Sequence, residues 1–248
     1  MTANKVMFIT GAAKRLGAFN AVFFHQAGWN IVLHYNQSAA PAVNLADKLN
    51  QQRPDSVKLV QGSFNSLLDI EQVGDDAVAA FGRLDCLLNN ASAFYATPIG
   101  SIDEQDWTAL VGSNMQAPLF LAQRCVHALK ETQGNIINMV DIHALRPLQK
   151  HSLYCMAKAA LVSMTYSLAQ ELAPLVRVNG IAPGAILWPE TALGDEQKSE
   201  ILKHIPLQQL GSEKDIAQGI EYLLNANYVT GQILAIDGGR SIASQGQL

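Results

Sequence analysis

Short apolar runs alternate with segments of helical length along the chain, and this alternation constrains the fold more than any other feature. The runs do not alternate strictly between apolar and polar residues, which is typical of strands buried on both faces of a parallel sheet. We expect seven strands, at Val6–Thr10, Asn30–Tyr35, Val57–Gln61, Leu84–Asn89, Asn135–Val140, Arg177–Ile181 and Gln232–Ile236. The expected helices include Gly17–Ala27, Ala40–Gln51, Ser66–Phe81, Asp103–Lys130, Ser152–Leu172 and Glu213–Leu224.

Repeated strand–helix units of this kind predict an α/β fold, a doubly wound, Rossmann-like parallel sheet of seven strands with helices on both faces. No internal repeat, charge run or low-complexity linker interrupts them, so we expect a single domain over residues 1–248. The stretch 185–205 breaks the rhythm after Pro183–Gly184. We expect a substrate lid around these residues, because long irregular connections in α/β enzymes often carry function.

Charged residues make up only 15% of the chain, against about 25% in an average soluble protein. No run approaches the roughly 18 uninterrupted apolar residues of a membrane-spanning helix, and the start of the chain does not resemble a secretory signal. The net charge of −4 gives no electrostatic footprint for nucleic acid. Three widely separated cysteines indicate neither a disulfide framework nor a metal site. We therefore expect a cytoplasmic protein without membrane or nucleic-acid partners.

A glycine loop follows the first expected strand, in the sequence TGAAKRLG. Gly11 and Gly17 would bring backbone N–H groups close to a pyrophosphate at a helix N-terminus. Arg15 occupies the middle glycine position of the TGxxxGxG spacing, where its guanidinium would lie beside the phosphates. No Asp or Glu appears between Gly17 and Asp47, so the acidic residue that usually holds the ribose of NAD is missing. His34, Asn36, Gln37 and Ser38 can form hydrogen bonds without repelling a 2′-phosphate, which favours NADP(H).

Tyr154 and Lys158 stand four residues apart on an expected helix and therefore lie on one face. A nearby ammonium favours phenolate and lowers the pKa of a tyrosine, so we expect Tyr154 to exchange a proton near neutral pH.

These motifs resemble the short-chain dehydrogenase/reductase family over essentially the whole chain. The matching segments are TGAAKRLG, NNAS at 89–92, GSNMQAP, YCMAK, VRVNGIAPG and IDGG. The resemblance implies that the tyrosine exchanges a proton with substrate, that the lysine lowers its pKa and holds the nicotinamide ribose, and that Asn114 anchors a water in the proton relay. It also implies a homotetramer. The charge-poor expected helices Asp103–Lys130 and Ser152–Leu172 agree with association between subunits.

Within this family the chain resembles the pteridine reductases. Asp141 stands thirteen residues before the tyrosine, where family members usually have serine. Arg15, LHY before Ser38, NNASAFYATP and NMVD complete the likeness. It implies NADPH-dependent reduction of dihydropterins, and of dihydrofolate, with Phe94 holding the pterin ring against the nicotinamide. Gln37 and Ser63 depart from the group's pattern, at positions that usually help to hold the 2′-phosphate and the adenine.

The expected site follows from these assignments. The catalytic residues would be Asp141, Tyr154, Lys158 and Asn114. The cofactor NADPH/NADP+ would be bound by Gly11, Arg15, Leu16, Gly17, His34, Tyr35, Asn36, Ser38, Asn90, Ala91, Ser92, Tyr154, Lys158, Pro183 and Gly184. The pterin or folate substrate would be bound by Arg15, Ser92, Phe94, Asp141 and Tyr154.

Other interpretations of the same residues remain open at this level. Phe94 fits an ordinary core position, and Asp141 fits the cap of a following turn. A carbonyl reductase acting on an acyl or sugar ketone is a second enzymatic hypothesis, and a non-catalytic NADP-binding sensor is a third. We assign no role to His143 or His151.

Overall fold

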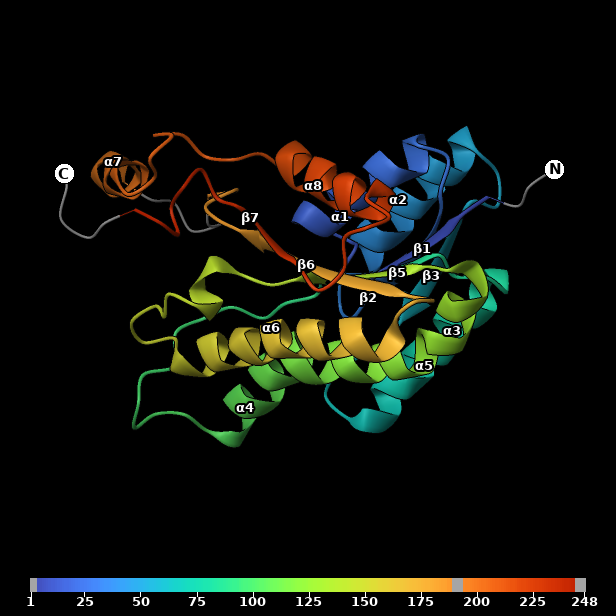
Figure 1. Ribbon diagram of the computed structural model, residues 1–248, viewed down its shortest axis with the longest axis horizontal. Helices are drawn as coiled ribbons and strands as arrows, with labels where there is room; N and C mark the ends of the chain where they lie inside the picture. The colour runs from blue at the N-terminus through green and yellow to red at the C-terminus, as the bar shows by residue number, and fades with distance from the viewer. Residues whose placement is uncertain (1–3, 189–193, 244–248) are drawn as a thin grey trace.

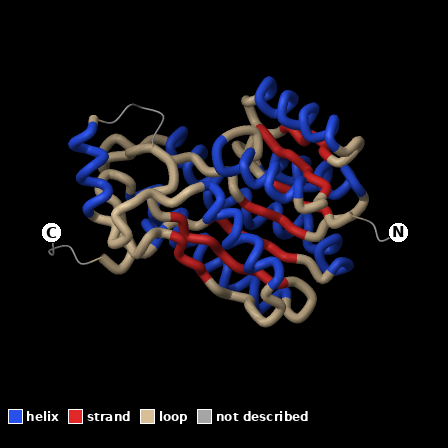
Figure 2. Tube along the Cα trace, turned by 90° about the horizontal axis from the view of Figure 1, so that it is seen from above, coloured by secondary structure: helices blue, strands red, loops and turns tan. Residues whose placement is uncertain are grey.

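Seven parallel strands form one sheet, in the order β3-β2-β1-β4-β5-β6-β7 (Figures 1 and 2), which confirms the predicted fold class. The computed structural model describes residues 4–188 and 194–243. The strands are β1 (Val6–Ile9), β2 (Asn30–Tyr35), β3 (Val57–Gln61), β4 (Cys86–Asn89), β5 (Asn135–Met139), β6 (Arg177–Pro183) and β7 (Ile233–Ile236). β6 extends two residues beyond its predicted end, because Ala182 and Pro183 still pair with β7.

Helices cover both faces of the sheet. They are α1 (Arg15–Gln26), α2 (Ala39–Gln52), α3 (Leu67–Phe81), α4 (Glu104–Val111), α5 (Ala117–Thr132), α6 (Ser152–Leu172), α7 (Asp195–Lys203) and α8 (Glu213–Asn225). In Figure 1, α1, α2 and α8 lie above the sheet, and α3, α4, α5 and α6 lie below it. Each helix layer packs against the sheet to form a separate hydrophobic core. In β1, Met7 and Ile9 pack into the upper cluster, whereas Val6 and Phe8 pack into the lower one, so a continuous apolar run is buried on both faces.

The predicted helix Asp103–Lys130 is wrong as one continuous element. It is divided into α4, a π-helical turn at Gly112–Gln116 and α5. A Cβ at Gly112 would lie 2.6 Å from the carbonyl oxygen of Phe64, and the Ser113 hydroxyl both donates to Ala109 O (2.7 Å) and accepts from Ala93 N (3.1 Å). These contacts hold the widened turn against neighbouring loops. Single π-turns of this kind are frequent at functional sites.

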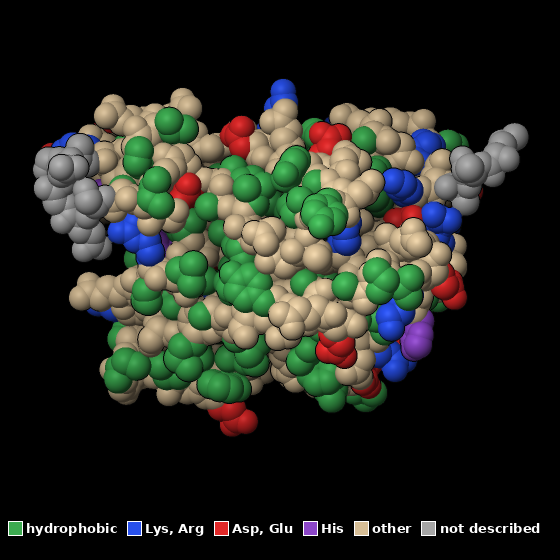
Figure 3. Space-filling view, in the orientation of Figure 1, with side chains coloured by type: hydrophobic (Ala, Val, Ile, Leu, Met, Phe, Trp, Pro, Cys, Tyr) green, Lys and Arg blue, Asp and Glu red, His purple; other side chains and the backbone are tan. Residues whose placement is uncertain are grey.

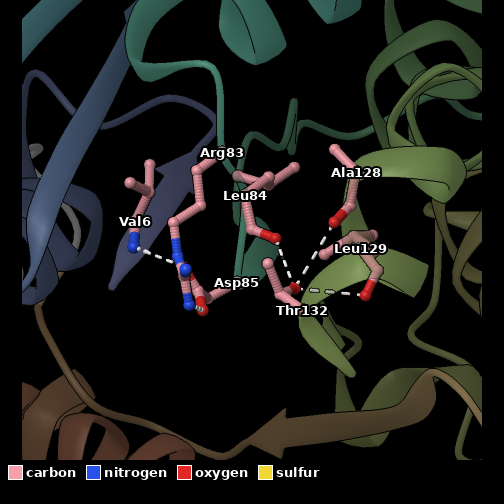
Figure 4. Close-up of polar contacts among 7 residues, drawn as sticks. All are labelled: Val6, Arg83, Leu84, Asp85, Ala128, Leu129 and Thr132. Carbon is pink, nitrogen blue, oxygen red and sulfur yellow. Dashed lines mark hydrogen bonds and ion pairs between the residues drawn. The ribbon is translucent and has the colours of Figure 1, made fainter. Parts of the chain in front are cut away.

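A cluster of polar contacts lies at the amino-terminal ends of the strands (Figure 4). The buried carboxylate of Asp85 accepts hydrogen bonds from Val6 N (2.8 Å) and from both Nε (2.8 Å) and Nη2 (2.7 Å) of Arg83. Nearby, the Thr132 hydroxyl donates to Leu84 O (2.7 Å). The start of β1, the start of β4 and the end of α5 are thereby joined, far from the carboxyl ends of the strands, where ligands bind in such sheets.

The expected lid, residues 185–205, is described except for 189–193, and it contains helix α7. Figures 1 and 2 show α7 beyond the β7 end of the sheet. None of the helices in residues 4–188 and 194–243 is long and apolar enough to cross a bilayer.

Candidate active site

The strand order reverses between β1 and β4, and their carboxyl ends form one crevice. Thr10 and Asn90 join the two loops that leave these strands. The Thr10 hydroxyl oxygen accepts from the backbone N–H groups of Asn90 and Ala91 (both 2.9 Å), and Asn90 Nδ2 donates to the carbonyls of Thr10 (2.8 Å) and Gly11 (3.2 Å). A cavity of about 490 Å³ opens above them.

Gly11 and Gly17 shape the floor of this cavity. Gly11 has a left-handed φ of +62°, and a Cβ there would lie 3.0 Å from the Cα of Ala91. A Cβ on Gly17 would overlap the carbonyl oxygen of Gly11. Both positions therefore require glycine, and they leave the N-terminus of α1 open to a phosphate.

Arg15 also has a left-handed backbone, with φ of +50°, at the position where the sequence spacing expects glycine. This conformation costs an L-residue about 1–2 kcal/mol relative to the right-handed region. Its side chain lines both the 490 Å³ cavity and the neighbouring cavity of about 570 Å³. The strained backbone thus belongs to a residue that both cavities share.

His34 supports the glycine loop. Its Nδ1 accepts a hydrogen bond from Gly11 N (3.1 Å), so its Nε2 carries the proton and donates to Gly62 O (3.1 Å). Its ring stacks on Phe64 with centroids 4.7 Å apart. Burial lowers the pKa of His34 to about 4, so the ring is neutral at physiological pH. Because both nitrogens are engaged, His34 holds the loop that would contact the cofactor, although its ring also borders the cavity.

The 570 Å³ cavity brings together predicted catalytic groups from the turn after β5 and from α6. The Tyr154 hydroxyl donates to Oδ2 of Asp141 (2.6 Å), and Oδ1 of Asp141 accepts from His143 N (2.8 Å). The buried Lys158 ammonium donates to Met139 O (2.7 Å) and lies 5.7 Å from the centroid of the Tyr154 ring. Asp141 therefore does cap the following turn, and it partners the tyrosine at the same time.

The expected lowering of the Tyr154 pKa is wrong. Burial raises the pKa of Tyr154, the charge of Asp141 and the hydrogen bond to it raise it further, and a hydrogen bond with Ser92 opposes them in part. Burial also lowers the pKa of Lys158 to about 8, while the Asp141 carboxylate raises it. Burial first, and the Asp141 carboxylate second, thus favour the protonated form of Tyr154.

Phe94 is 54% exposed at the mouth of this cavity and is not part of the core. Its ring meets Tyr154 edge-on, with centroids 4.8 Å apart, and stacks on His151 at 4.9 Å with an interplanar angle of 16°. His151, to which the sequence assigned no role, therefore supports the ring from one side. An exposed, supported aromatic ring is a platform for a flat ligand.

Asn114 lies behind the cavity and is fully buried. Its Nδ2 donates to Ala93 O and Leu110 O (both 2.9 Å), and its Oδ1 accepts from the Ser92 hydroxyl (2.7 Å). With these three bonds its side chain positions Ser92, which lines both cavities. The assignment of Asn114 as a catalytic residue stays a prediction.

Most of the predicted residues meet at the two cavities. Those that line at least one of them are Gly11, Arg15, Leu16, Gly17, His34, Asn36, Asn90, Ala91, Ser92, Phe94, Asp141, Tyr154, Lys158, Pro183 and Gly184. Tyr35, which is buried, and Ser38, which precedes α2, line neither, so their link to the cofactor stays a prediction. Sequence reasoning missed Lys14 and Arg240, which line the first and second cavity. Lys14 could have been predicted as a cavity residue from its place within the glycine loop TGAAKRLG, whereas no motif that we used pointed to Arg240.

A doubly wound sheet whose switch-point cavity adjoins a buried Tyr–Lys pair defines an oxidoreductase that uses a nicotinamide cofactor. Residues 11–241 match the family described as "Enoyl-(Acyl carrier protein) reductase". The chain belongs to the short-chain dehydrogenase/reductase family.

Named relatives cover nearly the full length of the chain. Pteridine reductase 1 of Leishmania tarentolae is 36% identical, with 96% of each chain covered. The 3-oxoacyl-(acyl-carrier-protein) reductase FabG of Staphylococcus aureus is 29% identical over 96% of this chain and 99% of its own. FabG of Staphylococcus epidermidis is 28% identical, over 95% of this chain and 98% of its own. The activity is thus that of an oxidoreductase, and these relatives differ in substrate.

Proposed function

We propose that the protein is an NADPH-dependent pteridine reductase, which reduces dihydropterins such as 7,8-dihydrobiopterin or dihydromonapterin, and dihydrofolate, to their tetrahydro forms. The main support for this proposal is the 2.6 Å hydrogen bond between Tyr154 and Asp141, two residues that line the same cavity as the exposed ring of Phe94. The similarity to pteridine reductase 1 supports the same substrate class.

The chemistry of a pterin explains why this site has a carboxylate. A pterin is a flat heterocycle with amino and ring-nitrogen groups, and a carboxylate accepts their N–H bonds. A stacked phenyl ring adds about 0.5–1.5 kcal/mol beyond its buried area. In this proposal Phe94 orients the ring, Asp141 binds it and passes protons, and Tyr154 donates a proton toward the ring nitrogen. The bound nicotinamide supplies the hydride.

The residues of the first cavity fit NADPH. Lys14 and Arg15 line it, and none of the described lining residues is acidic. A 2′-phosphate would meet two cations and the amide of Asn36 there, without a carboxylate to repel it. We assign the pyrophosphate to the loop between Gly11 and Gly17, because only the absence of side chains at these positions leaves the N-terminus of α1 accessible.

A substrate panel tests the proposal. The purified protein is assayed with 7,8-dihydrobiopterin, 7,8-dihydrofolate and an acetoacetyl thioester, each with NADPH and with NADH. We expect turnover of the two reduced pterins with NADPH and a higher KM for NADH. Absence of turnover with every pterin and folate would overturn the assignment.

A 3-oxoacyl reductase is the second candidate, and the similarity to two FabG proteins favours it. A ketone substrate needs a hydroxyl donor beside its oxygen, and Asp141 occupies the position where family members usually have serine. Asp141→Ser separates the candidates. If the second candidate is right, the variant gains ketone reduction and the parent shows no activity on pterins.

The remaining assignments concern assembly and surroundings. In Figure 3, hydrophobic side chains gather over the lower half of the molecule, where Figure 1 places α4, α5 and α6. The exposed apolar residues of these helices include Trp107, Leu119, Met156 and Tyr166. We assign this surface to a homotetramer, for which light scattering is the measurement, and a monomer at micromolar concentration would refute it.

We also place the protein in the cytoplasm, as a single domain. The three free cysteines are buried, which agrees with a reducing compartment. The stretch 185–205 is assigned as the substrate lid, because Ala185, Ile186 and Leu187 line the substrate cavity.

A further inference from the structure

A third cavity, of about 820 Å³, adjoins the candidate active site. It has Ile142, His143 and Arg240 in common with the substrate cavity. Its walls come from the turn after β5, the end of α7 and the segment after β7. None of the groups assigned to proton transfer lines it, so it is an extension of the substrate site rather than part of the reaction centre.

The walls of this cavity are basic. The titratable residues among its described lining are His143, Arg146, Lys203, His204 and Arg240, and no Asp or Glu stands among them. One carboxylate lies near two of these groups, because Glu200 pairs with Lys203 at 3.5 Å and with His204 at 3.8 Å. Among the described residues neither arginine forms an ion pair, although the charge of the nearby Asp237 acts on Arg240, and the lining itself carries a net positive charge.

Arg240 lies at the junction of the two cavities, and hydrogen bonds from Arg146 and to Asp237 fix the backbone around it. The guanidinium of Arg146 donates to the carbonyls of Arg240 (2.8 Å), Ser241 (2.7 Å) and Ala243 (3.0 Å). The carboxylate of Asp237 accepts from Gly239 N (2.9 Å) and Ser241 N (2.6 Å). Both carboxylate oxygens of Asp237 thus accept hydrogen bonds from backbone N–H groups. Such anchoring reduces the entropy that a bound anion would cost when it orders the arginine.

The rim of the cavity is apolar. Leu145 is 75% exposed and Ile242 is 86% exposed, and both line the opening together with Pro147 and Pro206. Exposed aliphatic side chains at the opening would lose contact with water if an apolar group packed on them, which favours binding of such a group. A ligand that suits these walls therefore combines an apolar spacer with a negatively charged end.

We propose that the 820 Å³ cavity binds the anionic tail of the substrate, so that the enzyme prefers reduced pterins whose side chain ends in carboxylates or phosphate. This inference rests on the proposed function, and it names the substrate class of the same site. Arg240 meets the tail first, because it lines both cavities, and Lys203 lies on the wall of the tail cavity alone. The aminobenzoyl-glutamate tail of dihydrofolate has the required spacer and carboxylates.

The test compares substrates that share a ring and differ in their tail. The ratio of kcat/KM for 7,8-dihydrofolate to that for 7,8-dihydrobiopterin is measured in the parent, Arg240→Gln, Lys203→Gln and Lys48→Gln. Dihydroneopterin monophosphate replaces dihydrofolate in a second arm, which distinguishes phosphate from carboxylate. We expect the ratio to fall about tenfold in Arg240→Gln and several-fold in Lys203→Gln, in the range of a lost charge-assisted contact. Lys48→Gln, on the exposed surface of α2, is the matched control and keeps the parent ratio.

A binding measurement separates this inference from the proposed function. p-Aminobenzoylglutamate, which has the tail without the ring, is titrated into the parent and the variants by calorimetry. We expect binding that weakens in Arg240→Gln and with added salt. Unchanged ratios in both arms, together with no binding of the fragment, would overturn the inference even if pterins are reduced. Fragment binding without turnover of any pterin would instead overturn the proposed function and leave the anion site standing.

Discussion

The hydroxyl of Tyr154 lies 2.6 Å from Oδ2 of Asp141, and the other carboxylate oxygen accepts from the backbone N–H of His143. One side chain therefore orders the turn after β5 and adds to the effect of burial in raising the pKa of the tyrosine. Burial and the neighbouring carboxylate both favour the protonated phenol.

Asp141→Asn tests this relationship. The amide oxygen can still accept from His143 N, so we expect little change in thermal stability. The amide can neither bind the N–H groups of a pterin as a carboxylate does nor pass a proton to Tyr154, so we expect the rate of proton-coupled reduction to fall about 100-fold. Single-turnover kinetics with dihydrobiopterin measure this rate. Tyr154→Phe, which removes the phenol hydroxyl, is the comparison variant. Parent-like rates in Asp141→Asn would contradict a role for the carboxylate.

Gly11→Ala separates backbone strain from steric exclusion of the cofactor. Gly11 and Gly82 share a φ of +62°, but only a Cβ at Gly11 meets other atoms, whereas none lies within 4 Å at Gly82. Both alanine variants should lose about 1–2 kcal/mol of stability through the left-handed backbone. Only Gly11→Ala should weaken NADPH binding, by tenfold or more, as measured by fluorescence titration. Equal loss of binding in Gly82→Ala would show that strain alone is responsible.

His34 offers a comparison between two replacements. His34→Phe keeps an aromatic ring against Phe64 but leaves the Gly11 N–H without its acceptor, which costs roughly 1–3 kcal/mol when the donor is buried. His34→Asn supplies an amide oxygen near the position of Nδ1. We expect the KM for NADPH to rise about tenfold in His34→Phe and less in His34→Asn, with kcat nearly unchanged in both. The reverse order would contradict the positioning role.

The pKa of Lys158 predicts two opposite pH dependences. Its folded pKa of about 8 lies below the value of about 10.4 in unfolded chains, so the folded state binds this proton less tightly. Stability from this group therefore rises as the pH increases from about 8 to about 10.4, and it is lowest below pH 8. If the ammonium is needed for proton supply, kcat/KM falls above pH 8. Urea unfolding of the parent and Lys158→Met, with pH–rate profiles, measures both, and a flat alkaline limb would exclude a catalytic cation.

Local patterns in the sequence determined much of this protein. The apolar runs located all seven strands, because strands buried on both faces need uninterrupted apolar residues. The spacing of Tyr154 and Lys158 placed both on one side of α6, since four residues complete about one helical turn. The glycine loop located the first cavity, because only glycine permits the close approach there.

Tertiary structure alone decided the properties that depend on distant neighbours. The π-turn around Asn114 arises from contacts with the loops near Phe64 and Ala93, which local periodicity does not encode. The pKa of Tyr154 is raised by burial and by a carboxylate from the turn after β5, whereas the spacing to the lysine predicted that it is lowered. Arg240 reaches the substrate cavity because Arg146, 94 residues earlier, holds its backbone. Burial and electrostatics act through space, so the chemistry of each group is settled only when the fold brings its neighbours together.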